Sequence, residues 1–175
     1  MPTPDRTSLA QIVDASRALA EEGGASRLTM QAVADRVGVK APSLYKRVRD
    51  RDALLALVAE ATMDDLAQRL AASDGTLTGL AHAYRAFAKA HPQGFRLMFT
   101  VDVTASALDR ASEPILRAAR DLVGEDVALE AARLITAWAT GFIDMELAGA
   151  FRLGGDVDRA FAFGLARLER GLRDG

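Results

Sequence analysis

The chain has 175 residues, half of them apolar and only 6% aromatic, and it carries a formal net charge of −2 at pH 7. Alanine and leucine dominate and β-branched clusters are scarce, which favours an all-α fold over one built from strands. The absence of cysteine excludes a disulfide framework and a thiolate metal site, no apolar run is long enough to cross a bilayer, and the first residues lack the apolar core of a signal peptide, so we expect a cytoplasmic protein without a membrane segment.

The charge is unevenly distributed along the chain. Residues 1–51 hold nine Lys or Arg and six Asp or Glu, a net charge of +3, whereas residues 52–175 hold thirteen and eighteen, a net charge of −5. This asymmetry indicates that the N-terminal part meets an anionic partner and that the remainder does not.

Three short helices are expected in the basic part. The first covers residues 8–22, where apolar side chains recur at helical spacing until two glycines end it. The next two, about 29–36 and 41–47, have the pattern of a helix-turn-helix. Gly38 between them can adopt the positive φ of a tight turn, and Pro42 fits the first turn of the second helix, where its missing N–H costs nothing.

The second helix of this motif lies in a strongly basic stretch. From Arg36 to Arg51 there are six Lys or Arg and one Asp, a net charge of +5. Such charges neutralise phosphates, and the motif typically places its second helix in the major groove of DNA. The alternative is an ordinary helical hairpin with a solvated basic face. We expect DNA contacts from Thr29, Lys40, Ser43, Tyr45, Lys46 and Arg51, with Ser43, Tyr45 and Lys46 in the groove and Thr29 and Arg51 on phosphate.

A long helix that Asp50 caps connects this head to a helical body. The expected fold is all-α, with a three-helix head, the long helix and a C-terminal body, about nine helices in total. The expected ranges from the long helix onwards are 51–72, 76–91, a short helix that starts at Pro92, 106–123, 126–152 and 156–172.

Large apolar side chains in the body are candidates for an effector pocket. Trp138, Phe142 and Met145 fall at i, i+4 and i+7 and therefore lie on one helix stripe. Bundles commonly bind apolar ligands between their helices, but core packing is the favoured explanation for any single large apolar residue. The candidate ligand-binding residues are Phe87, Phe95, Met98, Phe99, Trp138, Phe142 and Met145.

Three polar residues, Thr140, Asp144 and Glu146, interrupt the most apolar helix. Because a buried carboxylate is costly unless it is paired, we expect one of these groups to meet a ligand, Arg85 or Arg96. A solvated edge or a contact at the rim of a dimer is the alternative.

Enzymatic signatures are missing from the sequence. It has no nucleophile–base pair, glycine-rich phosphate loop or paired-carboxylate motif, and His82 and His91 lack the spacing of metal ligands. We therefore expect no catalytic residues, no metal and no cofactor. A helical enzyme or an adaptor with an incidental helix-turn-helix remains the alternative.

Several short segments carry a resemblance to a known family. They are Leu28-Thr29, Val33-Ala34, Gly38-Val39, Leu44-Tyr45 and Leu54-Leu55 in the head, and residues 83–88, His91-Pro92, 95–99, Gly141-Phe142 and 146–149 in the body. With these segments, residues 28–55 resemble the DNA-binding signature of the TetR/AcrR family of one-component transcriptional regulators, and the body is similar to the subgroup with a WHG-type C-terminal domain. The family usually has serine, phenylalanine and lysine where this chain has Lys40, Val48 and Arg51.

The resemblance implies a DNA-binding domain over residues 1–50 and a ligand-binding and dimerisation domain over residues 51–175. It implies a regulator, by family habit a repressor, that binds an inverted-repeat operator as a homodimer and responds to a small molecule, which the apolar pocket candidates make hydrophobic or aromatic. We expect the dimer to form through the last two long helices. The predicted interface stripes are Ile135, Ala139 and Ile143 on one helix and Phe161, Leu165 and Leu168 on the other, with Ala148, Gly149 and Ala150 allowing close approach.

Overall fold

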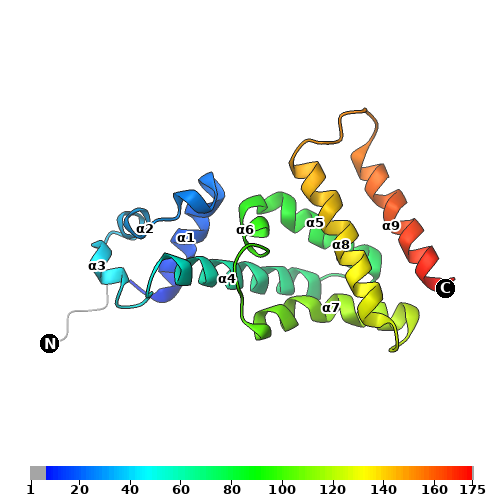
Figure 1. Cartoon of the computed structure of the whole chain (residues 1–175), viewed down its shortest axis with the longest axis horizontal. Coiled ribbons are helices and arrows are strands. Elements are labelled where there is room, and N and C mark those ends of the chain that lie inside the picture. The colour runs from blue at the N-terminus through cyan, green and yellow to red at the C-terminus, as the bar shows by residue number, and fades with distance from the viewer. Residues whose placement is uncertain (1–6, 175) are drawn as a thin grey trace. The chain divides into compact units, whose positions relative to one another are not determined.

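The computed structural model describes residues 7–174, and within this range the chain is all-α, as predicted (Figure 1). Among residues 7–174, no helix is both long and apolar enough to span a bilayer. The helices are α1 (Leu9–Gly23), α2 (Met30–Arg36), α3 (Ala41–Leu44), α4 (Arg51–Ala71), α5 (Leu77–Ala90), α6 (Pro92–Leu97), α7 (Ala105–Val123), α8 (Ala128–Leu147) and α9 (Val157–Arg173), with a short 3-10 helix, η1 (Ala25–Arg27), after α1.

Two helices end earlier than the sequence predicts. α3 stops at Leu44 because the carbonyl of Leu44 accepts the N–H groups of both Arg47 and Val48, which closes a turn in place of a further helical turn. α8 stops at Leu147, five residues before its predicted end. Gly149 adopts a φ of 63° there, and the N–H of Ala150 bonds to the carbonyl of Met145 at 2.9 Å, which is a glycine-dependent helix stop.

The chain divides into two compact units. The first comprises Met1–Asp65 and His91–Leu108, and the second comprises Leu66–Ala90 and Asp109–Gly175. α4 therefore begins in the first unit and ends in the second. These units differ from the predicted division at residues 50 and 51 because the segment after α5 returns to the head, where Leu97 belongs to the same apolar core as α1 and α2.

The core of the first unit holds α2 and α3 in place. Val33 and Ala34 of α2 are fully buried, and Leu44 of α3 is 1% exposed. Small Ala34 lets α3 cross α2 closely, as the sequence predicts. Burial of side chains such as Leu44 stabilises the head by about 1.5–3 kcal/mol each, which fixes the surface that α3 turns outward.

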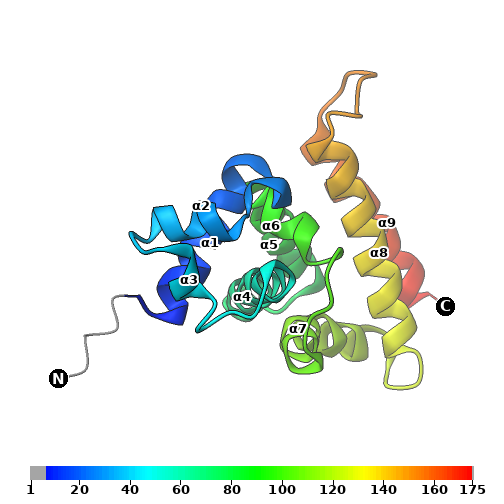
Figure 2. The ribbon, with the colours of Figure 1, turned by 60° about the vertical axis from the view of Figure 1, so that its left-hand side comes forward.

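The core of the second unit lies among α5, α7, α8 and α9. α8 and α9 run antiparallel and lie side by side in Figures 1 and 2. Leu77 and Ala81 of α5, Ile135 of α8 and Phe161 and Leu165 of α9 form one buried cluster. α8 is therefore covered on one side by its own chain.

Candidate functional site

The turn between α2 and α3 has the geometry that a helix-turn-helix requires. Gly38 adopts a φ of 72°, and the N–H of Val39 bonds to the carbonyl of Ala34 at 2.9 Å. Pro42 lies in the first turn of α3, as predicted. Leu44 and Val48 point into the core, so the intervening side chains of α3 and the next turn face solvent.

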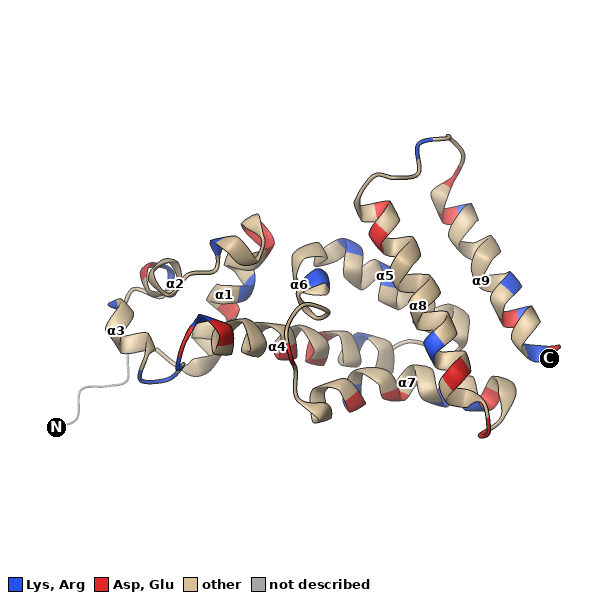
Figure 3. Cartoon of the chain, in the orientation of Figure 1, with Lys and Arg blue, Asp and Glu red and all other residues tan. Residues whose placement is uncertain are grey.

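The side chains predicted to enter a groove lie together on this outward surface. Lys40, Ser43, Tyr45 and Lys46 are all exposed, and Tyr45 is 54% exposed. Figure 3 shows Lys and Arg just before α3 and in the segment that leads from α3 into α4. The surface can therefore offer cations, hydroxyl groups and one aromatic ring to an anionic partner.

Thr29 and Arg51, the predicted phosphate contacts, also organise the head itself. The Thr29 hydroxyl caps α2 by accepting the N–H of Ala32 at 3.1 Å and keeps its own hydrogen for donation. Arg51 donates from Nε to the carbonyl of Leu28 at 2.8 Å and from Nη2 to that of Ala25 at 2.6 Å. Arg51 thus ties the start of α4 to the segment before α2, and three of its five N–H groups are left for other partners.

Asp50 caps α4, as predicted. Its carboxylate accepts the N–H of Ala53 at 2.8 Å and an N–H of Arg49 at 2.6 Å. These bonds hold the pKa of Asp50 below its usual value, with the Ala53 N–H as the largest cause and Arg49 next. The cap fixes the point at which the chain leaves the basic surface and enters the long helix.

Glu21 joins α1 to α6 within the first unit, a contact that the sequence analysis missed. Its carboxylate accepts the N–H of Gly94 at 2.7 Å and that of Gln93 at 3.1 Å, in the first turn of α6. A hollow of about 400 Å³ lies beside this contact, and Arg17, Asp65 and Glu21 are among its lining residues. No sequence pattern signals a bond from a side chain to backbone groups more than 70 residues away.

The seven predicted ligand-binding residues are divided between the two units. Phe95, Met98 and Phe99 belong to the first unit and Phe87, Trp138, Phe142 and Met145 to the second. Phe87 and Phe95 are fully buried and Met98 is nearly so, whereas Phe99 and Met145 are exposed.

Trp138 and Phe142 form the centre of an aromatic cluster in the second unit. Their ring centroids lie 5.7 Å apart, and each lies 5.1 Å from the ring of Phe161. Phe151 covers Phe142 at 4.7 Å. A methyl group at Gly164 would come within 2.4 Å of the Trp138 ring, so this glycine makes room for the tryptophan. Both rings are half-buried, and the arrangement has aromatic faces that a flat apolar molecule can contact.

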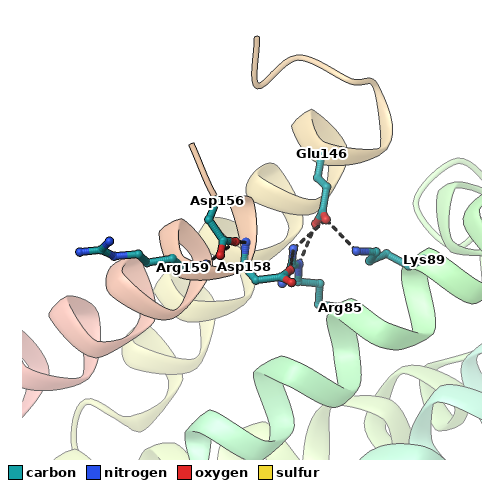
Figure 4. Close-up of polar contacts among 6 residues, drawn as sticks. All are labelled: Arg85, Lys89, Glu146, Asp156, Asp158 and Arg159. Atoms are coloured by element: carbon teal, nitrogen blue, oxygen red, sulfur yellow. Dashed lines mark hydrogen bonds and ion pairs between the residues drawn. The ribbon is translucent and has the colours of Figure 1, made fainter. Parts of the chain in front are cut away.

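Arg85 of α5 lies beside this cluster and joins three helices (Figure 4). Its side chain is 7% exposed and forms two bonds of 2.7 Å to the carboxylate of Glu146 at the end of α8. Its Nη2 also meets Asp158 of α9 at 2.7 Å, and its guanidinium lies 4.8 Å from the centre of the Phe161 ring. The pairing of Glu146 with Arg85 confirms one of the partners predicted for the polar residues of this helix.

Two further polar contacts complete this region. Lys89 approaches Glu146 at 2.9 Å, and the bonds from Arg85 and then Lys89 hold the pKa of Glu146 below its usual value despite its burial. The hydroxyl groups of Tyr84 and Thr140 lie 2.9 Å apart. Burial raises the pKa of Tyr84 to about 12, so the phenol stays protonated. The sequence did not identify Lys89 and Asp158 because partner choice depends on how the helices pack.

Five of the six residues of the predicted dimer stripes are buried inside the second unit and the sixth, Leu168, is partly buried, which corrects that prediction. Ile135, Ala139 and Ile143 are buried, as are Phe161 and Leu165, because α8 and α9 use these faces to pack on their own chain. Another face of the two helices is open. Its apolar and small residues are Leu134, Ala137, Gly141, Met145 and Ala148 on α8 and Phe163 on α9.

Comparison with known proteins places the chain in a family. Residues 12–58 match the model of the bacterial regulatory proteins of the tetR family, and residues 77–168 match the model of the Tetracyclin repressor-like C-terminal domain. The second match alone spans more than half of the chain.

Individual proteins match over almost their whole length. The uncharacterized HTH-type transcriptional regulator YobS of Bacillus subtilis is 25% identical over 173 residues, which cover 92% of this chain and 90% of YobS. A possible TetR family transcriptional regulator from Streptomyces coelicolor A3(2) is 25% identical, with a TM-score of 0.76 and coverage of 94% of this chain and 98% of that one. A variant of TetR from Acinetobacter baumannii AYE in complex with minocycline shares the fold at 23% identity, with a TM-score of 0.73 and coverage of 96% and 97%. Members of this family regulate transcription and are not enzymes, and the chain belongs to the TetR family of bacterial transcriptional regulators.

Proposed function

We propose that the chain is a repressor that binds an inverted-repeat DNA operator as a homodimer and is controlled by a small hydrophobic or aromatic molecule. The observation that carries the DNA part is the outward surface of α3. Leu44 and Val48 anchor that helix, while Lys40, Ser43, Tyr45 and Lys46 face solvent. We assign Ser43, Tyr45 and Lys46 to the major groove and Lys40, Thr29 and Arg51 to phosphates, with Arg51 also positioning the head.

The experiment that tests DNA binding starts from selection of bound duplexes out of a random pool. An inverted repeat is the expected outcome, since one short helix reads few base pairs and a two-fold dimer reads two half-sites. Tyr45→Ala and Lys46→Ala should each weaken binding to the selected duplex by about 1–3 kcal/mol, and Lys40→Ala, which removes a phosphate contact, should lower the log–log salt slope by about one unit.

The matched control is Arg133→Ala, which removes an exposed cation from α8. It should bind the duplex as the wild type does. Folded Tyr45→Ala and Lys46→Ala proteins that bind with wild-type affinity and salt dependence would refute the assignment of α3 to the groove.

The exposed face of α8 and α9 supports dimerisation through these helices. Leu134 and Met145 are each nearly half exposed, and Phe163 is 61% exposed. Small residues between them, such as Gly141, permit helices to approach closely. A face of this kind on a soluble protein commonly marks an interface. Sedimentation equilibrium should give the mass of a dimer, and a monomer that still binds the full operator would refute this part.

We place the effector beside Trp138 and Phe142, which are half-buried and aromatic. Of the seven predicted residues, Phe87, Phe95 and Met98 fill cores, so they shape a site more than they line it. The minocycline bound by the TetR variant of the same fold supports a small-molecule effector. α4 passes from one unit to the other and offers a route for control. Coupling of this kind usually amounts to ~1–3 kcal/mol, or about 5–150-fold in DNA affinity.

A single tryptophan makes the effector site measurable, since Trp138 is the only one in the chain. Candidate ligands should be screened for release of DNA, and each active ligand should change Trp138 fluorescence over the same concentration range. Phe142→Leu should weaken the binding of that ligand. A ligand that releases DNA without changing Trp138 emission, and to which Phe142→Leu responds normally, would place the site elsewhere.

A further inference from the structure

The loop between α8 and α9 presents an apolar side chain to solvent from a fixed position. Leu153 is fully exposed, and Phe151 two residues earlier packs its ring on Phe142. Both ends of the loop are held by one cation, because Glu146 near the end of α8 and Asp158 at the start of α9 both bind Arg85 (Figure 4). Leu153 is therefore an exposed apolar side chain on a loop whose two ends are held in place.

A hollow lies at the opposite end of the same pair of helices. It has a volume of about 470 Å³ and lies between the end of α7, the start of α8 and the end of α9. Leu122, Val127, Leu134 and Leu172 give it an apolar lining, and Val127 and Leu134 are each nearly half exposed. The hollow can accept an aliphatic side chain.

Residues of opposite charge lie beside Leu153 and in the lining of the hollow. Arg152 adjoins Leu153, and within the described part of the chain it bonds only to the carbonyl of Gly149. Glu130 lines the hollow and pairs with no cation among the described residues, whereas the Arg173 that shares the lining is held by Glu169. Arg152 in the loop and Glu130 in the hollow therefore carry opposite charges, and neither has an ionic partner among the described residues of its own protomer.

We propose that in the dimer the loop of each copy seats Leu153 in the hollow of the other copy, with Arg152 beside the partner's Glu130. This inference rests on the proposed dimer through α8 and α9. In a two-fold interface, residue i of one copy meets residue j of the other and j meets i. Leu153 and the hollow lie at opposite ends of the antiparallel helices α8 and α9. They satisfy this rule when α8 of one copy packs antiparallel to α8 of the other copy. Both contacts then form at once.

The absence of cysteine allows a direct test by cross-linking. Leu153→Cys combined with Leu134→Cys should give a covalent dimer with a short bis-maleimide, and neither single variant should. The two positions cannot react within one protomer, because α8 alone separates Leu134 from the loop by about 20 Å. Efficient cross-linking of Leu153→Cys alone would show that loop meets loop in a parallel arrangement and would overturn the proposal. A ladder of larger species from the double variant would show an open, non-two-fold contact and would also overturn it.

The affinity of the dimer supplies the second test. Leu153→Ser should raise the dimer dissociation constant at least about tenfold, since an aliphatic side chain leaves a buried site. Leu9→Ser on α1, which removes a leucine that is 40% exposed in the first unit, should leave the constant unchanged. Arg152→Glu and Glu130→Arg should each weaken the dimer, and the two together should restore it, which a merely structural role of either residue would not produce.

Failure of this proposal can be distinguished from failure of the proposed function. A monomeric wild type would overturn both. A dimeric wild type whose double cysteine variant does not cross-link, or whose Leu153→Ser variant dimerises normally, would overturn only the seating of the loop.

Discussion

The sharpest stability prediction concerns the Arg85 clamp, which consists of the bonds from Arg85 to Glu146 and Asp158. Arg85→Met keeps an unbranched, flexible side chain, although a shorter one, and removes the charge, which leaves Glu146, 14% exposed, with the half-exposed Lys89 as its cation. Removing one partner of a buried ion pair costs about 3–5 kcal/mol, because the remaining charge stays buried. We expect the lower end, about 3 kcal/mol, since Lys89 remains. Asp158 adds little because it is 79% exposed.

The second half of this prediction is recovery by an apolar pair. Arg85→Met with Glu146→Leu removes both charges, and we expect its free energy of unfolding to lie within about 1 kcal/mol of the wild type. For a chain of this length the single variant should lose roughly 6–12 °C in Tm. Urea unfolding followed by circular dichroism, at one fixed protein concentration because the dimer contributes to stability, measures both variants.

A surface ion pair provides the matched control. Arg117 and Glu113 pair within α7 at 3.3 Å with side chains 70% and 48% exposed, so Arg117→Met should cost no more than about 0.5 kcal/mol. A stable Arg85→Met protein would show that the clamp is dispensable. A double variant as unstable as the single one would show that Arg85 acts through packing on Phe161 and not through its charge.

Three further predictions concern acid stability, the turn and α6. The pKa of Glu146 is lowered in the folded chain, so its contribution is present above the usual value of 4.5 and is lost as pH falls through the folded value; Glu146→Gln should therefore flatten the loss of stability in acid unfolding below pH 4.5. Gly38→Ala should lower the free energy of unfolding by about 1–2 kcal/mol in thermal melts, since φ is 72° there, whereas Gly171→Ala, where an added methyl meets nothing within 4 Å, should raise it by up to about 1 kcal/mol; equal effects would contradict this. Glu21→Gln should lower the free energy of unfolding in urea by about 1–2 kcal/mol, because it weakens the bonds to the start of α6. The control is Glu22→Gln, which should lower it by less than about 1 kcal/mol because Glu22 pairs with Arg36 on the surface. The reverse order would refute the role of Glu21.

Local signals in the sequence were sufficient for the head. Gly38, Pro42 and Asp50 each act within a few residues of chain, so their roles as cap and turn residues could be predicted and are confirmed. The contact of Glu21 with the start of α6 depends on tertiary packing, and no local pattern reports it. For the same reason the compact first unit contains residues 91–108, which the division implied by the family resemblance assigned to the body.

Part of the Arg85 clamp could be predicted from the chemistry of the residues alone, without knowledge of how the helices pack. The cost of burying a carboxylate led to the expectation that a polar residue of α8 meets a ligand, Arg85 or Arg96, with a solvated edge or a dimer rim as the alternative. The choice between Arg85 and Arg96, and the arrival of Lys89 and Asp158, follow from how α5, α8 and α9 pack. Spacing along a helix cannot supply that information.

α8 shows why helical periodicity assigned the wrong face to the dimer. Apolar and small residues occupy two faces of this helix, so two stripes satisfy the spacing, Ile135-Ala139-Ile143 and Leu134-Gly141-Met145. The chain itself buries the first stripe and leaves the second in water. A helix that is apolar on both faces needs cover on both, and the protomer supplies only one. In the proposed dimer this second cover comes from a second copy, whose α8 exposes the same stripe.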